Sequence, residues 1–169
     1  MDYAAPSSPS LAHIDFGALD TFRFADGGGF PKSYSEFVRT AGWARTFGLW
    51  LIYPPVLTGF ADGRGRALRL TEQFRAIFRD GEEEDFDWMI APDGNWLLAA
   101  QLQVFGWSEN GDVVLWDTAQ RGANGEFPVW ESRGMNTLHL LGANLDEALP
   151  GLSERAGNQS IEPLGASKL

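Results

Sequence analysis

Three segments of the chain carry apolar residues at the spacing of an amphipathic helix. After Pro31 these residues recur at i, i+3, i+4 and i+7, which places them on one face, and Gly42 stands where a helix stops. A second helix is predicted from Thr71 to Arg79, capped by the threonine and ended by Gly81. A third, shorter helix is predicted ahead of Pro150, which is expected to interrupt it. The residues that define the three helices are Tyr34, Phe37, Val38 and Ala41, then Phe74, Ile77 and Phe78, then Asn144, Leu145, Ala148 and Leu149.

The other apolar runs predict strands. Trp96 to Trp107 is long enough for one long strand or two short ones, and the turn residues Asn110 and Gly111 lead from it into another strand. This is the strongest hairpin signal in the chain. The further strand segments are residues 47–53, 113–116, 128–131 and 137–141. Helices followed by hairpin-linked strands predict an α+β domain, with a central, largely antiparallel β-sheet and helices packed beside it.

The length of 169 residues corresponds to one domain, at about 150 residues for each. Pro and Ser residues dominate positions 1–10, which predicts a flexible N-terminal arm. Small and polar residues at 157–169 predict a flexible C-terminal tail. The folded domain is therefore expected to span residues 11–156. Residues 15–26 and 62–69 have no clear pattern, and no element is predicted for them.

The composition excludes several classes of protein. Hydrophobic residues make up 44% of the chain, too many for a disordered protein, and the absence of cysteine excludes disulfide scaffolds, thiolate metal sites and cysteine nucleophiles. The formal net charge of −10 argues against a direct nucleic-acid partner, because phosphates are bound by Lys and Arg. No apolar stretch is long enough to cross a membrane, and the start of the sequence lacks a basic signal-peptide region. A cytoplasmic protein without membrane contact is expected.

The residues that usually carry catalysis or bind metal are sparse. His13 and His139 lie far apart, and neither has a second ligand at the spacing of a zinc site. Ser108 follows a glycine as in the nucleophile motif of hydrolases, but it enters a hairpin instead of a strand-to-helix turn. The glycines at 27–29 lack the lysine that follows directly in a phosphate-binding loop. No catalytic residue, metal or cofactor is predicted.

One short segment concentrates the negative charge. Six of the eight residues from 80 to 87 are acidic, with no base among them. The segment can be a solvated loop that only keeps the protein soluble. It can also be a docking surface for a basic partner, with Phe86 and Trp88 as aromatic anchors among the charges. A third possibility is a hydrolase that uses Asp85 or Asp87, although paired catalytic carboxylates usually face a cleft.

Three further segments match a known pattern when they are taken together. Residues 30–42 contain a Phe-Pro step, a Tyr and a Phe-Val pair before Gly42; residues 104–117 contain the Asn-Gly-Asp turn; and residues 138–149 form a closing strand and helix. In this order they resemble the SUKH superfamily of Smi/Knr-like proteins. The resemblance implies an α+β domain with a central, largely antiparallel sheet. Bacterial members are mostly immunity proteins that bind and block a toxin domain, often a nuclease, and fungal relatives are regulatory interaction proteins. The family supplies no catalytic residues.

We therefore expect a non-catalytic bacterial immunity protein that neutralises a cognate toxin of the nuclease type. Such a toxin is basic where it holds phosphate, and an acidic inhibitor can take the place of the phosphate. A regulatory interaction scaffold and a carboxylate-dependent hydrolase stay as alternatives. The residues expected to bind the partner are Glu82, Glu83, Glu84, Asp85, Asp87 and Trp88, together with Glu109 and Asp112 of the predicted hairpin.

Overall fold

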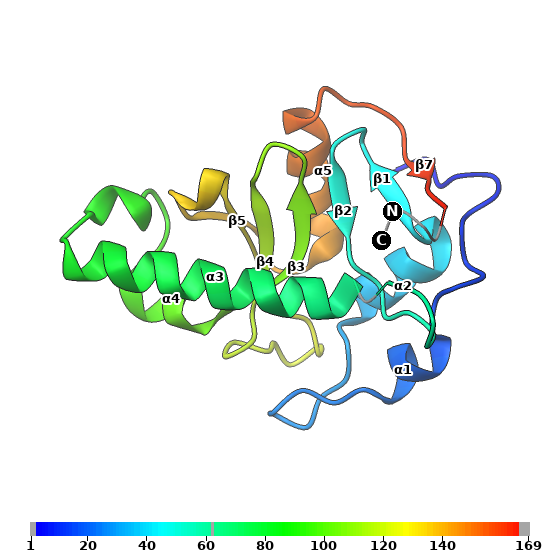
Figure 1. The fold of residues 1–169 in the computed structure, drawn as a ribbon, viewed down its shortest axis with the longest axis horizontal. Helices are drawn as coiled ribbons and strands as arrows, with labels where there is room; N and C mark the ends of the chain where they lie inside the picture. Colours follow the sequence, from blue (N-terminus) through cyan, green and yellow to red (C-terminus); the bar gives the residue numbers. More distant parts are fainter. Residues whose placement is uncertain (1–2, 62, 166–169) are drawn as a thin grey trace.

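A seven-stranded antiparallel sheet lies at the centre of the computed structural model, which describes residues 3–61 and 63–165 (Figure 1). The strands lie in the order β6-β5-β4-β3-β2-β1-β7. They are β1 (Ala44–Thr46), β2 (Trp50–Ile52), β3 (Leu102–Ser108), β4 (Val113–Asp117), β5 (Val129–Ser132), β6 (His139–Gly142) and β7 (Glu162–Pro163). The helices are α1 (Phe16–Thr21), α2 (Lys32–Ala41), α3 (Gly63–Glu83), α4 (Trp96–Gln101) and α5 (Leu145–Arg155), with short 3₁₀ helices η1 (Asp87–Met89) and η2 (Arg133–Met135). The predicted α+β class with a central antiparallel sheet is confirmed.

Helices cover both faces of this sheet, with α3 in front of the strands and α5 behind them in Figure 1. Successive side chains of β4 point to opposite faces. Val113 and Leu115 pack with α3 and α4, whereas Val114 and Trp116 pack with α2 and α5. A strand that is buried on both sides carries a continuous apolar run instead of an alternating one, which explains the sequence of β4.

Helix α2 confirms the helix predicted after Pro31. Its predicted apolar face is buried, with at most 1% of any of the four side chains exposed. The helix ends as predicted at Gly42, where a φ of 66° leaves the helical region and the N–H still donates to Val38. Such a positive φ suits glycine, because a Cβ would be strained there.

Helix α3 is more than twice as long as the helix predicted from Thr71 to Arg79. It begins at Gly63, within a segment for which no element is predicted, and it continues to Glu83. Thr71 is not a cap, since its hydroxyl donates to Ala67 O and accepts the N–H of Val104, which ties the helix to β3. Gly81 does not end the helix. A Cβ at this position would overlap Met89 Sδ, so the glycine allows η1 to pack against α3.

Two predicted strands have a different structure. The predicted strand from Trp96 to Trp107 is helix α4 followed by β3, because the side chain of Asn95 accepts the N–H of Leu98 and caps a helix. The predicted strand at 47–53 is the turn of the β1–β2 hairpin followed by β2. Its turn contains Phe47 and Gly48, which both have positive φ, and the buried Phe47 conceals the turn within an apolar run.

The chain remains helical through Pro150, contrary to the prediction. Helix α5 continues to Arg155, and its buried side chains include Leu149 and Leu152 on either side of the proline. Proline removes one backbone hydrogen bond from a helix interior. Burial of this apolar face against the sheet outweighs that loss.

The chain on both sides of residues 11–156 packs against the domain. Ile161 is buried and β7 pairs with β1 at the edge of the sheet, so the predicted tail contributes to both the core and the sheet. In the predicted arm, Tyr3 contacts the ring of Phe37 and Ser10 forms a β-bridge with Gly42. Residues 1–2 of the arm and 166–169 of the tail lie outside the described residues.

The predicted hairpin joins β3 to β4, with a longer turn than the Asn-Gly pair alone. Ser108 N–H donates to Asp112 O, which closes a three-residue loop around Asn110. Within the loop Gly111 has a φ of 86°, whereas Asn110 is not among the residues with positive φ. The turn is therefore a three-residue hairpin loop with glycine at its left-handed position.

Substitution of Gly111 tests the hairpin. Gly111→Val should lower the free energy of unfolding by about 1–3 kcal/mol, the usual cost of a strained backbone position. Nothing lies within 4 Å of the position that an added Cβ would occupy, so the cost is conformational and does not come from overlap. Urea unfolding measures it, with Gly59→Val, also at positive φ and in open space, as a comparison outside the sheet. An unchanged stability for Gly111→Val would contradict the hairpin geometry.

Candidate partner-binding surface

The acidic segment forms the C-terminal end of α3 and the turn into η1. The N–H of Phe86 donates to Gly81 O at 2.9 Å and the N–H of Asp85 donates to Glu82 O at 3.1 Å. These two bonds, with Asp85 at a φ of 57°, form a Schellman motif in which an aspartate takes the place usually held by glycine. The segment is therefore not one continuous loop: its acids lie on the end of α3, on the turn that caps it and on η1, and all of them are solvent-exposed.

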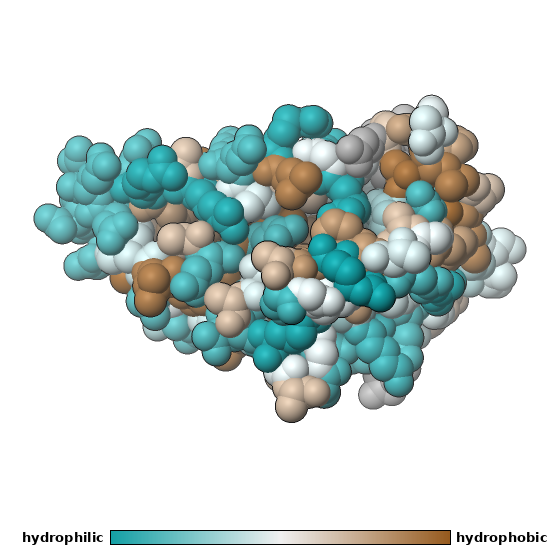
Figure 2. Space-filling model, turned by 90° about the horizontal axis from the view of Figure 1, so that it is seen from below, coloured by the Kyte–Doolittle hydropathy of each residue, from teal (hydrophilic) through white to brown (hydrophobic). Residues whose placement is uncertain are grey.

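The charges of this segment are solvent-exposed and concentrated. All six acids are exposed, and within the described chain none of them has a cationic side-chain nitrogen within 4 Å. They are Asp80, Glu82, Glu83, Glu84, Asp85 and Asp87. The C-terminus of a helix is the negative end of its dipole, where each nearby anion costs about 0.3–1 kcal/mol instead of stabilising. Helix stability therefore does not explain why the acids lie here. Figure 2 shows hydrophilic side chains gathered over the left end of the molecule, which α3 and η1 form in Figure 1.

Two aromatic rings lie exposed beside these charges. Phe86 and Trp88 stack with ring centroids 4.5 Å apart, and they are 38% and 54% exposed. Trp88 Nε1 donates to Asn136 Oδ1 at 3.2 Å, which fixes the orientation of the indole. The next residue, Met89, is buried against Gly81 and holds η1 to the helix. We name Phe86, Trp88 and the six acids the acidic-aromatic surface.

Glu109 and Asp112, the two hairpin residues predicted to bind the partner, differ in their exposure to solvent. Glu109 is exposed at the turn and forms an ion pair with Arg45 at 2.8 Å. Asp112 is only 6% exposed, and its carboxylate accepts the N–H of Gly134 at 2.8 Å and a bond from Arg155 at 2.9 Å. Asp112 therefore has a structural role, and its prediction as a surface contact is not supported by its position.

Asp112 belongs to a cluster of two buried carboxylates and two partly exposed arginines that the sequence analysis missed. Arg155, at the end of α5, lies between Asp112 and Glu131, with its nitrogens 2.9 Å from a carboxylate oxygen of each. Glu131 is fully buried, and burial raises its pKa, although the nearby Arg155 and Arg133 partly offset the rise. The available signal was an acid directly after the apolar Val129 and Trp130 of β5. We name Asp112, Glu131, Arg133 and Arg155 the charged cluster.

The turn at η2 connects the charged cluster to the acidic-aromatic surface. Its Gly134 donates to Asp112, and Asn136, directly after it, accepts from Trp88. Met135 between them has a φ of 55°, a left-handed conformation that the bonds on either side hold in place. The structure therefore does not bring Trp88 and Asp112 into one surface, but it supports both from one short turn.

The positions of the other candidate residues do not form a recognisable catalytic arrangement. Asp85 and Asp87, the candidates for a hydrolase, are exposed and do not line the cavity of about 710 Å³ beside α5. Ser108 is fully buried and hydrogen-bonded within its hairpin. His13 is buried, which lowers its pKa, and burial followed by the nearby Arg133 lowers the pKa of His139. Among residues 3–61 and 63–165 no group of three or more His, Asp or Glu could hold a metal ion.

Comparison with protein-family models, with curated proteins and with solved structures found no match to this chain. No helix in the described part of the chain combines the length and apolarity needed to cross a membrane.

Removal of Arg155 tests the charged cluster. Arg155→Met should lower the free energy of unfolding by about 3 kcal/mol near neutral pH, because it leaves two buried carboxylates without their shared cation. Burial raises the pKa of Glu131 in the folded state, and the nearby Arg155 partly offsets that rise. Without Arg155 the pKa of Glu131 is higher still, and the variant loses stability as the pH rises through it. The stability deficit of Arg155→Met should therefore shrink as the pH is lowered from about 7 to about 5.

Urea unfolding at both pH values measures the effect of Arg155→Met. Arg69→Met, at an exposed position of α3, is the control and should change stability by about 0.5 kcal/mol or less. A deficit that is independent of pH would show that Arg155 acts through packing alone.

Proposed function

We propose that the protein is a non-catalytic, cytoplasmic immunity protein that neutralises a basic, nuclease-type toxin domain by binding it with the acidic-aromatic surface. The observation that carries the proposal is a helix end that combines an exposed, stacked Phe-Trp pair with six acids, none of which has a cationic partner among the described residues, although their charges oppose helix stability there. The resemblance of residues 30–42, 104–117 and 138–149 to the SUKH superfamily supports the same function.

The two components of the surface have different tasks in this proposal. The six acids attract a basic face over several ångströms and raise the rate of encounter. The Phe86–Trp88 pair offers apolar area at low cost in side-chain entropy, which is the character of an interface hot spot. When these acids contact the phosphate-binding face of the toxin, their carboxylates would also take the place of the nucleic-acid backbone. Binding and inhibition then follow from one contact.

Charge reversal tests the acids in binding to a cognate toxin domain, which the proposal expects to be basic and of the nuclease type. Changing Glu83, Glu84 and Asp85 together to Lys should slow association by on the order of tenfold or more at low salt, because charge steering acts on the on-rate. The difference should shrink as the Debye length falls to about 8 Å at physiological salt. Stopped-flow kinetics measures both rates. Lysines also suit the negative end of α3, so the variant should stay folded.

The matched control reverses three exposed acids elsewhere: Glu72, Glu154 and Glu162. It changes the net charge by the same amount, so a purely global charge effect would slow both variants equally. Unchanged association for the first variant at every salt concentration would exclude the acidic-aromatic surface as the contact and would point to Glu109 and the hairpin turn.

Truncation of the exposed indole tests the anchor. Trp88→Ala should act mainly on dissociation and weaken binding by about 2 kcal/mol or more, as expected for a hot-spot residue. Because the side chain is 54% exposed, far-UV circular dichroism should show an intact fold. Leu97→Ala, at a side chain that is 72% exposed on α4, is the control for loss of exposed apolar area. Equal effects of the two substitutions would contradict a specific role for Trp88.

A further inference from the structure

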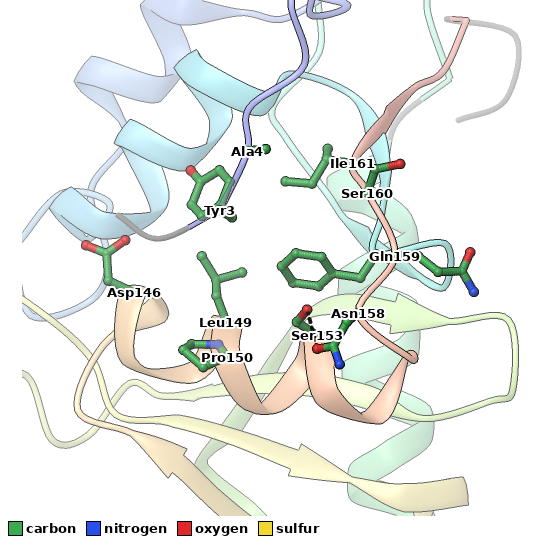
Figure 3. A pocket seen from close by; sticks show the side chains of 11 residues that line it. Tyr3, Ala4, Asp146, Leu149, Pro150, Ser153, Asn158, Gln159, Ser160 and Ile161 are labelled. Atoms are coloured by element: carbon green, nitrogen blue, oxygen red, sulfur yellow. Dashed lines mark hydrogen bonds between the residues drawn. The ribbon is translucent and has the colours of Figure 1, made fainter.

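The exposed face of α3 carries a charge pattern that reaches beyond the acidic-aromatic surface. Figure 1 shows this helix lying across the front of the molecule. The cavity beside α5 is less selective, since Asp146 is the single charged side chain among the described residues that line it (Figure 3). The charges on α3 are both more numerous and more regularly placed.

Basic and acidic residues lie at opposite ends of this face. At 3.6 residues per turn, side chains three or four residues apart share one side of the helix. Arg66 and Arg69 lie near the start of α3 and are exposed. Asp80 lies near its end and is exposed as well. Glu84 follows the helix directly, and its N–H donates to Asp80 O at 3.1 Å, which continues the helical pattern by one residue.

The middle of the face is neutral along its centre and charged on one flank. Gln73 and Ala76 are exposed there, and the small alanine side chain lets another backbone approach closely. Glu72 and Arg79, also exposed, lie together on one flank, because their spacing of seven residues returns to the same side of the helix. The whole face is therefore basic, then mixed, then acidic along its length.

These charges are not neutralised within the part of the chain that the structure describes. None of them has an ion-pair partner within 4 Å there, even where helical spacing would permit one, as between Arg79 and Glu83. Helix α3 also has no acid in its first turn and no base in its last. Its charges consequently oppose the helix dipole at both ends.

A second, antiparallel copy of α3 matches the pattern. A two-fold axis beside Arg75 brings each residue opposite the one that lies equally far along the helix on the other side of the axis. In this register every exposed charge named above meets an opposite charge on the same flank, to within one residue or about 1.5 Å along the helix. The pairs are Arg66 with Glu84, Arg69 with Asp80 and Glu72 with Arg79 of the second copy, each formed twice.

The arginine at the axis does not oppose this arrangement. Two copies of Arg75 would repel each other if both guanidinium groups extended into the interface. Instead the group is turned back toward the sheet, where Nε and Nη2 donate to Leu102 O at 3.1 and 2.9 Å. The neutral Gln73 and Ala76 remain at the centre of the contact.

From this complementarity we infer that a second copy of the chain binds the exposed face of α3 in an antiparallel, two-fold symmetric dimer. Ion pairs at a surface are individually weak, so the dimer is transient, with a dissociation constant on the order of 0.1 mM. Asp80 and Glu84 also belong to the acidic-aromatic surface, so a toxin bound there would displace the second copy. Only this last consequence rests on the proposed function.

Two charge-exchanged variants of the full chain test the dimer. One carries Arg66→Glu with Arg69→Glu, and the other carries Asp80→Lys with Glu84→Lys. Each alone opposes like charges and should self-associate about tenfold more weakly than the wild type, whereas an equimolar mixture should associate at least as tightly as the wild type. Sedimentation equilibrium up to about 1 mM protein measures this, at about 0.15 M salt to limit long-range repulsion. Both changes suit the dipole of α3, so the variants should stay folded.

Matched variants separate the contact from the general repulsion between acidic molecules. Arg23→Glu with Lys32→Glu, and Glu154→Lys with Glu162→Lys, make the same changes in net charge at exposed positions outside α3. They should self-associate more tightly than the α3 variants of equal charge, and mixing them should bring no recovery.

A disulfide test locates the axis. The chain has no cysteine, so a cross-link reports only the introduced residue. Ala76→Cys should form disulfide-linked dimers about tenfold faster than Ala100→Cys, a matched exposed alanine on α4, because α3 brings the two copies of position 76 together. Adding Arg66→Glu and Arg69→Glu should remove this advantage.

Several results would overturn the inference. They are a wild-type chain that stays monomeric at about 1 mM, equal weakening by the α3 variants and their matched controls, no recovery in the mixture, assembly beyond two chains, or equal cross-linking at positions 76 and 100. Every one of these measurements uses the protein alone. Failure of the dimer is therefore distinguishable from failure of toxin binding.

Discussion

Burial of both faces of one antiparallel sheet is the constraint on which the rest of this structure depends. Strands β3 and β4 place alternate side chains against two separate helical layers. Helix α3, with 21 residues and therefore about 31 Å long, lies in front of the strands, and Figure 1 shows its C-terminal end extending beyond them. This end has no sheet beneath it. Its side chains are consequently free to be polar, and the sequence places its most acidic segment there.

The helix end combines a stable backbone with unfavourable charge. The Schellman bonds to Gly81 and Glu82, and the packing of Met89 on Gly81, hold the turn in one conformation. The acids act against the helix dipole, and Asp85 takes a backbone conformation that glycine adopts more readily. The surface on which the proposed function depends is therefore a rigid helix end that displays charge and two stacked rings.

In the charged cluster the acidic residues are buried, in contrast to the exposed acids of the acidic-aromatic surface. Asp112 and Glu131 are buried and share Arg155, which joins the end of α5 to β5 and to the β3–β4 turn. Buried ion pairs contribute little net stability but make the removal of one partner costly. The cluster therefore fixes the position of α5, and through Gly134 it also fixes the turn that supports Trp88. Surface and interior acids in this protein thus have separate roles that their residue types alone do not distinguish.

The sequence by itself determined the features that depend on residues close together in the chain. The spacing of Tyr34, Phe37, Val38 and Ala41 defines α2, and Gly42 ends it, because a helix face and a positive φ are local properties. The turn at Gly111, the α+β class and the concentration of acids at 80–87 could be predicted for the same reason. These features include most of the acidic-aromatic surface.

Only the tertiary structure decided the features for which packing between distant parts of the chain overrides the local sequence pattern. Gly81 lies inside α3 because η1 packs against it, and α5 continues through Pro150 because its apolar face is buried. Asp112, which looks like a surface residue in the turn sequence, is buried because Arg155 reaches it from 43 residues away. The cavity depends on Tyr3, Asp146 and residues 158–161 meeting in space. No sequence window contains them all, since their proximity arises from the packing of the two chain ends against α5.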